Sequence, residues 1–225
     1  MFRISVLRVA SALGIAAACV FGTPASATTL VGNGYANGSE TFTLSAPFPP
    51  AVNPVGAGAF TGTFGGVPII FWCAELTQTF SFGTSYDYTA SLLNNSALSR
   101  LFTEVSSAAR LSTPDTSAAF QLAIWEILFE SQSPYNISNG NFKVTDDHGN
   151  AAAIALANGW LANLNNFQPL NQVFLLHSDT NQDFITDTPI PPRLIVPEPS
   201  SLPLLGIGLL AIAFGLRRRT LQQLH

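Results

Sequence analysis

Two residues of this sequence, Cys73 and Gln121, could react with each other. Cys73 is the only cysteine left once an N-terminal leader that contains Cys19 is removed. A lone thiol outside the cytoplasm has no disulfide partner within its own chain, and an exposed one would be prone to oxidation. A thiolate can attack a side-chain carboxamide, expel ammonia and form a thioester between Cys73 Sγ and Gln121 Cδ. An outside amine or hydroxyl could then take the acyl group of Gln121.

Each of the two residues belongs to a recognisable element. Cys73 lies near the end of the apolar run 67–76, whose β-branched and aromatic residues predict a buried strand. Gln121 lies in a predicted helix that begins at Thr113 and runs to about Glu130. Its start has a hydroxyl N-cap, a proline at the first helical position and a carboxylate in the first turn. A contact between this strand and this helix would bring the two side chains together.

The helical periodicity turns Gln121 toward the protein interior. Glu126 and Glu130 are expected to mark the solvated face, and Gln121 lies roughly 140° around the helix from Glu126. Its neighbours one turn away include Trp125 and other apolar residues. A buried amide without a partner costs about 1–3 kcal/mol, so Gln121 needs either a hydrogen-bond partner or a reaction.

A thioester hydrolyses in water and therefore needs a dry pocket. The aromatic residues Phe71, Trp72 and Trp125 flank the reactive pair in the sequence and are expected to supply it. Simpler interpretations remain open for both members of the pair. Most free cysteines are small buried hydrophobes, and a core glutamine can hydrogen-bond to the backbone.

Two segments of the sequence resemble the Cys-Gln thioester domains of bacterial surface adhesins. They are Phe-Trp-Cys-Ala-Glu-Leu at 71–76 and Phe-Gln-Leu-Ala-Ile-Trp at 120–125. The resemblance implies one domain over residues 28–190 that combines a β-sheet part with a helical part. It also implies covalent attachment to an extracellular nucleophile, either a protein amine or a polysaccharide hydroxyl. We expect one acyl transfer per molecule, without turnover, cofactor or metal, so the protein is not expected to be an enzyme.

The N-terminus has the pattern of a secretory signal peptide over residues 1–27. A cationic start precedes an apolar run from Val9 to Gly22, and an Ala-Ser-Ala site ends at Ala27. A membrane anchor is the alternative, but the run is shorter than the roughly 20 residues that a spanning helix needs.

The C-terminus has three parts typical of a sorting signal. A Pro-rich linker at 191–200 contains Pro197, Glu198 and Pro199, and residues 201–225 hold an apolar run from Leu202 to Leu216 followed by Arg217, Arg218 and Arg219. This order resembles the PEP-CTERM sorting signal of Gram-negative bacteria, whose Pro-Glu-Pro is recognised by an exosortase. The resemblance implies membrane attachment through the C-terminal helix before processing, and then a place in the cell envelope, on the outer surface or in the extracellular matrix. A simple tail anchor is the alternative.

Composition excludes several classes of protein. Of 225 residues, 47% are apolar and 10% are charged, against about 25% charged in ordinary domains, which argues against a disordered tail or a coiled coil. Residues 28–195 hold four basic and twelve acidic residues, a net charge of −8, so nucleic acid or anionic lipid is not an expected partner. The low cysteine count excludes a disulfide scaffold and a four-cysteine zinc site.

The order of predicted elements indicates an α+β fold, with a helical part inserted into a sandwich-like sheet. Strands are expected at 40–44, 67–76, 79–89, 142–145, 173–176 and 184–185, and helices at 91–107, 113–130 and 150–164.

Other candidate sites are weaker. Asp179, Asn181 and Asp183 alternate as the ligands of a calcium loop do. A solvated turn is the favoured interpretation, because Phe184 and Ile190 stand where such a loop has its glycine and its last glutamate. His148 and His177 have no metal-binding spacing, although either could act as a base. The alternative function is a noncovalent structural or carbohydrate-associated protein of the cell surface or exopolysaccharide matrix. A hydrolase ranks third, because no nucleophile–base motif is present.

Overall fold

The structure is a computed structural model that describes residues 27–130, 133–145 and 148–195. The predicted signal peptide up to residue 26 and the sorting segment from residue 196 lie outside the described residues. Within the described ranges, no helix is both long enough and apolar enough to cross a membrane.

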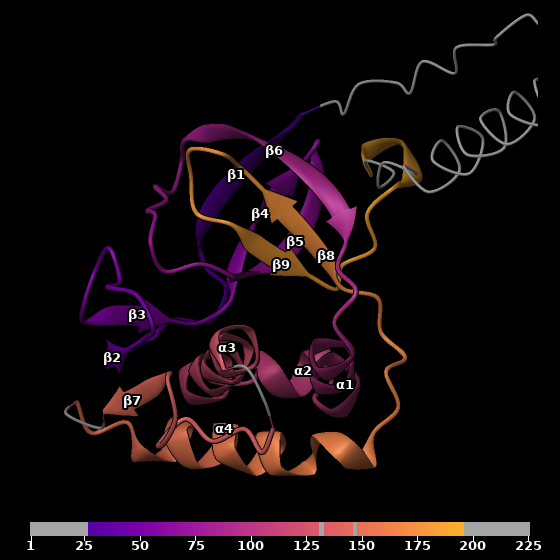
Figure 1. Cartoon of the computed structure of the whole chain (residues 1–225). Coiled ribbons are helices and arrows are strands. Elements are labelled where there is room, and N and C mark those ends of the chain that lie inside the picture. Colours follow the sequence, from indigo (N-terminus) through magenta and orange to yellow (C-terminus); the bar gives the residue numbers. More distant parts are fainter. Residues whose placement is uncertain (1–26, 131–132, 146–147, 196–225) are drawn as a thin grey trace, which may run out of the picture.

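Six strands form a closed antiparallel barrel at the centre of the fold (Figure 1). In barrel order they are β1 (Thr28–Tyr35), β4 (Phe60–Phe64), β5 (Val67–Cys73), β9 (Phe184–Thr186), β8 (Phe174–His177) and β6 (Ser85–Leu92). The sheet closes because β1 pairs with β4 on one side and with β6 on the other. The sheet part is thus a barrel, and the sandwich-like arrangement expected from the sequence is not seen.

Aromatic side chains fill the barrel. Phe71 of β5 packs against Phe184 of β9 with ring centroids 4.9 Å apart, and Phe60 of β4 lies 5.5 Å from Phe71. A small barrel leaves an interior that side chains alone can occupy, which matches this packing.

A second, three-stranded sheet lies beside the barrel. Its order is β3 (Val55–Ala57), β2 (Glu40–Ser45) and β7 (Lys143–Thr145), all antiparallel. The predicted strands at 40–44 and 142–145 correspond to β2 and β7, while β3 falls in a segment for which no strand is predicted.

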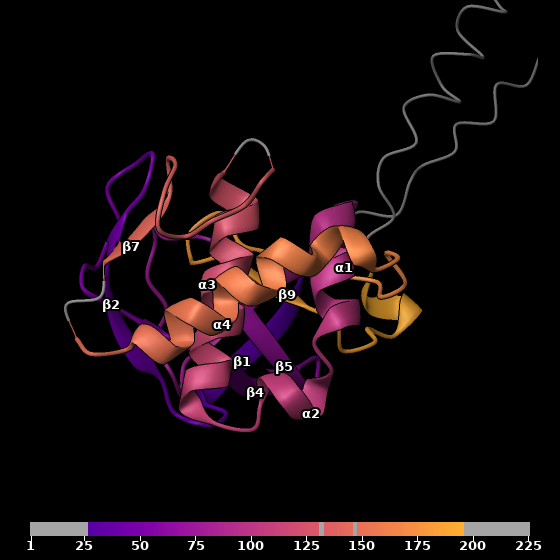
Figure 2. The same cartoon turned by 90° about the horizontal axis from the view of Figure 1, so that it is seen from below.

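The helical part is inserted between β6 and β8, as the sequence predicts. It contains α1 (Ser96–Glu104), α2 (Ser107–Arg110), α3 (Pro114–Phe129) and α4 (Ala151–Asn163), and a short 3-10 turn at Leu164–Asn166 follows α4. A second 3-10 turn, Pro192–Leu194, comes after β9. Figure 1 shows α3 between the barrel and α4, and Figure 2 shows α4 crossing α3 from the outer side. Helix α3 is therefore covered by the barrel on one side and by α4 on the opposite side.

Helix α3 begins where the sequence predicts. The Thr113 hydroxyl accepts a hydrogen bond from the backbone N–H of Thr116 at 3.2 Å, Pro114 opens the helix, and Glu130 is its C-cap residue. The prediction that Glu126 marks a solvated face of α3 is wrong, because Glu126 has no exposed surface. The chain after α3 folds back over it, and the backbone N–H of Asn136 donates to Glu126 Oε1 at 2.6 Å.

Burial raises the pKa of Glu126 from 4.5 to about 7. The folded state therefore binds more protons than the unfolded chain between these two values, and the free energy of unfolding falls as pH rises from 4.5 through about 7. We expect Glu126→Gln to keep an acceptor for Asn136 and to gain stability relative to wild type across that window. Urea unfolding at a series of pH values measures this, and a stability difference that does not change with pH contradicts it.

A buried ion pair links the helical part to the barrel. Arg110 of α2 is 3% exposed and its Nη2 lies 2.6 Å from Oδ2 of Asp187, which follows β9. Its guanidinium also lies over the rings of Phe102 and Phe120, at 4.9 and 5.1 Å from their centroids. Phe120 directly precedes Gln121, so this cluster helps to fix α3 against the barrel.

Candidate thioester site

Cys73 ends strand β5 at the rim of the barrel, next to α3. Side chains alternate along the strand, so Phe71 points into the barrel core while Trp72 points the other way and packs on Phe120, with centroids 4.7 Å apart. Cys73 pairs with Phe184 of β9 and is 3% exposed. Strand β5 thus places the buried thiol of Cys73 next to helix α3.

The side-chain amide of Gln121 lies directly on the backbone of Cys73. Gln121 Oε1 accepts a hydrogen bond from the Cys73 N–H at 2.9 Å, and Gln121 Nε2 donates to the Cys73 carbonyl at 2.8 Å. Gln121 is 1% exposed, as its predicted orientation requires. The fold therefore brings the two candidate residues together and supplies the partner that a buried amide needs.

The thiol of Cys73 is protonated at neutral pH. Its Sγ donates to the backbone carbonyl of Glu75 at 2.6 Å. Burial raises the thiol pKa from 9.0 to about 12, although the hydrogen bond to the Glu75 backbone and the nearby Trp125 indole lower it in part. The carboxylates of Glu75 and Asp183 add to the rise.

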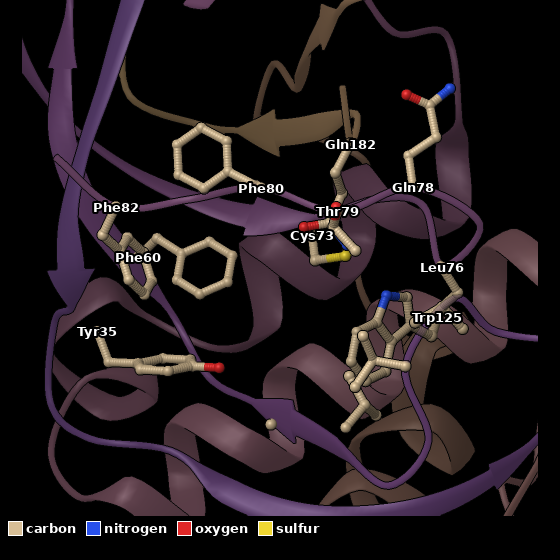
Figure 3. A pocket seen from close by; sticks show the side chains of 13 residues that line it. Tyr35, Phe60, Cys73, Leu76, Gln78, Thr79, Phe80, Phe82, Trp125 and Gln182 are labelled. Atoms are coloured by element: carbon tan, nitrogen blue, oxygen red, sulfur yellow. The ribbon is translucent and has the colours of Figure 1, made fainter. Parts of the chain in front are cut away.

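Cys73 borders a pocket of about 200 Å³ between the barrel and α3 (Figure 3). Aromatic side chains form much of its wall, namely Tyr35, Phe60, Phe80, Phe82 and Trp125. Val52 and Phe82 at its edge are 53% and 41% exposed, so the pocket lies at the protein surface. No Lys or Arg occurs among the described residues that line it.

The three aromatic residues predicted to house the site lie in different places. Trp125 lines the pocket, whereas Phe71 and Trp72 are fully buried outside its lining. The pocket is instead lined by Tyr35 of β1, by Phe60 of β4, and by Phe80 and Phe82 of the connection between β5 and β6. Of these four, only Phe80 and Phe82 lie in a segment with a sequence signal, the alternating residues that predict a strand at 79–89, and the structure places them in the connection before β6 (Ser85–Leu92).

The candidate calcium ligands have other partners. His177 Nδ1 lies 2.9 Å from Asp183 Oδ2, and His177 Nε2 lies 3.2 Å from Asp179 Oδ1. The hydrogen bond to Asp183 is the main cause that raises the pKa of His177. Asn181 Nδ2 donates to Ser178 Oγ at 3.2 Å, and in the part of the chain that the structure describes no cluster of His, Cys, Asp and Glu could hold a metal. His177 and His148 do not line the pocket.

Comparison with known proteins identifies the C-terminal segment. Residues 196–219 match the model of the PEP-CTERM protein-sorting motif, which contains Pro197, Glu198 and Pro199. The chain is an exported protein that an exosortase sorts. The motif also implies association with the cell envelope or surface of a Gram-negative bacterium. No curated protein and no solved structure matches the chain.

Proposed function

We propose that this exported protein forms an internal thioester between Cys73 and Gln121 and uses it to attach covalently to an extracellular nucleophile. The observation that carries the proposal is the pair of hydrogen bonds, 2.9 and 2.8 Å, between the Gln121 carboxamide and the backbone of Cys73. They hold the carbonyl carbon of Gln121 beside the residue that bears the mature chain's only thiol.

The same hydrogen bonds favour the chemistry of thioester formation. When the sulfur attacks Gln121 Cδ, negative charge develops on Oε1, which already accepts from the Cys73 N–H. The new bond joins Sγ to Cδ, the bond from Cδ to Nε2 breaks, and Nε2 leaves as ammonia carrying the former thiol proton. The products are one thioester and one ammonia.

The surroundings suit a thioester that must survive until it meets its target. Cys73 and Gln121 are almost completely buried, which limits hydrolysis, and the aromatic pocket lets a small group approach Cys73 from the surface. An amine or hydroxyl of the target then attacks Cδ, the bond from Cδ to sulfur breaks, and the thiol is restored. Each molecule reacts once, so the proposed protein attaches itself covalently to its target and does not turn over as an enzyme does.

Methylamine uptake tests this proposal. Incubated with methylamine, the mature protein should gain one methylamide, located on Gln121 by peptide mapping, and should release one titratable thiol at Cys73. A protein that gains no label and shows its thiol titratable from the start contradicts the proposal.

The second candidate is a noncovalent structural or carbohydrate-associated protein of the cell surface or matrix. One observation favours it: the two hydrogen bonds to Cys73 already satisfy the Gln121 amide without any reaction. In that case Gln121 only ties α3 to β5, and the mature protein keeps the full mass of its sequence.

A further inference from the structure

Trp125 carries a buried donor with no acceptor. Its side chain has no exposed surface, and the indole Nε1 is without a hydrogen-bond partner. An unpaired buried N–H is unfavourable, and in native proteins such groups usually have a reason. The reason here is expected among the atoms that the indole faces.

The indole faces the sulfur of Cys73. Trp125 lies one helical turn after Gln121, on the same side of α3, and lines the same pocket as Cys73. Figure 3 shows the indole nitrogen on the edge of the ring nearest the Cys73 side chain. The thiol donates to the Glu75 carbonyl in this state, which leaves the indole N–H free for a sulfur that has lost its proton.

We propose that Trp125 is a catalytic residue of the thioester, whose N–H donates a hydrogen bond to the Cys73 sulfur whenever that sulfur carries negative charge. This inference rests on the proposed function. In the attack on Gln121 the N–H stabilises the nucleophilic thiolate. In the later transfer the amine nitrogen bonds to Cδ, the bond to sulfur breaks, and the N–H stabilises the departing thiolate until it takes the proton that the amine releases. Trp125 keeps its own proton throughout.

The electrostatics of the pocket give this donor its importance. A thiolate in a buried site is strongly disfavoured, and the nearby carboxylates of Glu75 and Asp183 disfavour it further. No cationic side chain lines the described pocket, so compensation there must come from neutral donors, and the Trp125 N–H is a buried one that has no other acceptor. A hydrogen bond to a charged group is strong enough to change a rate by about tenfold or more.

The test compares wild type, Trp125→Phe and a protein with benzothienylalanine at position 125, which replaces the N–H by sulfur at almost unchanged volume. Intact mass first establishes that the thioester has formed, and the rate of methylamine uptake is then measured. We expect both variants to react about tenfold more slowly than wild type. The matched control, Trp160→Phe on α4, changes a half-buried tryptophan outside the pocket and should react at the wild-type rate.

A thiol measurement keeps the test independent of thioester formation. In a Gln121→Ala background the sulfur is free, and adding Trp125→Phe should slow its alkylation by iodoacetamide about tenfold at a fixed pH below the thiol pKa. Equal uptake rates in proteins that all carry the thioester, or equal alkylation rates, overturn the role of Trp125 and leave the proposed function intact. A wild-type protein that never loses ammonia overturns both.

Discussion

Cys73→Ala and Gln121→Ala should each abolish covalent uptake of methylamine. The first variant lacks the sulfur that forms the activated ester, and the second lacks the acyl carbon that accepts the amine. Gln121→Glu should be equally inactive, because it removes the amide that leaves as ammonia. This variant keeps the size of the side chain, so the loss of uptake would come from the missing amide. Mass spectrometry of each mature protein after incubation with methylamine measures the uptake.

A matched glutamine variant separates this effect from a general loss of structure. Gln172 is exposed and is not among the residues that line the pocket, so Gln172→Ala should take up methylamine as wild type does. Circular dichroism and urea unfolding should show that the Cys73 and Gln121 variants remain folded. Uptake that survives in Cys73→Ala or in Gln121→Ala would show that the site is assigned to the wrong residues.

Arg110→Ala should cause a large loss of stability, lowering the free energy of unfolding by about 3–5 kcal/mol. The change leaves the Asp187 carboxylate, whose side chain is only 16% exposed, without its cation. It also removes the hydrogen bond from Nη1 to the Val105 carbonyl, 2.9 Å long, and the stacking over Phe102 and Phe120. Urea unfolding of the mature protein measures the loss.

Two further variants show whether the loss comes from the buried charge. Arg100 donates an exposed hydrogen bond to Asn165 Oδ1, so Arg100→Ala should change stability by no more than about 1 kcal/mol. The double change Arg110→Met with Asp187→Leu should recover much of the stability, because no unpaired charge is left behind. An Arg110→Ala protein as stable as Arg100→Ala contradicts this account of the link between helices and barrel.

The elements that carry the reactive pair could be predicted because their signals are local. A hydroxyl, a proline and a carboxylate at 113–115 specify the start of α3, and a continuous apolar run specifies β5. The barrel could not be predicted, because its closure depends on pairing between distant segments. Strand β1, rich in glycine and threonine, pairs with both β4 and β6. The need for glycine at position 62 in β4 also comes from a distant segment, because a Cβ there would collide with the Val31 carbonyl of β1.

In the candidate site too, local sequence signals predicted some features, and contacts between distant segments determined the others. Helical spacing correctly turned Gln121 inward, and the structure places its amide on Cys73. The same spacing failed for Glu126, because the returning chain after α3 covers a face that an isolated helix would leave to water. Phe71 and Trp72 were assigned to the pocket as sequence neighbours of Cys73, but strand alternation sends them to opposite faces, and the pocket forms beyond the strand end.

The intact mass of the mature protein, purified without exposure to amines, tests the internal bond most directly. A thioester between Cys73 and Gln121 makes the protein lighter than its processed sequence by one ammonia, whereas Cys73→Ala should have the full mass calculated from its own processed sequence. We predict the lighter mass in wild type and the full mass in the variant. A wild-type protein at full mass, with Cys73 alkylated readily after unfolding in denaturant, would contradict the account.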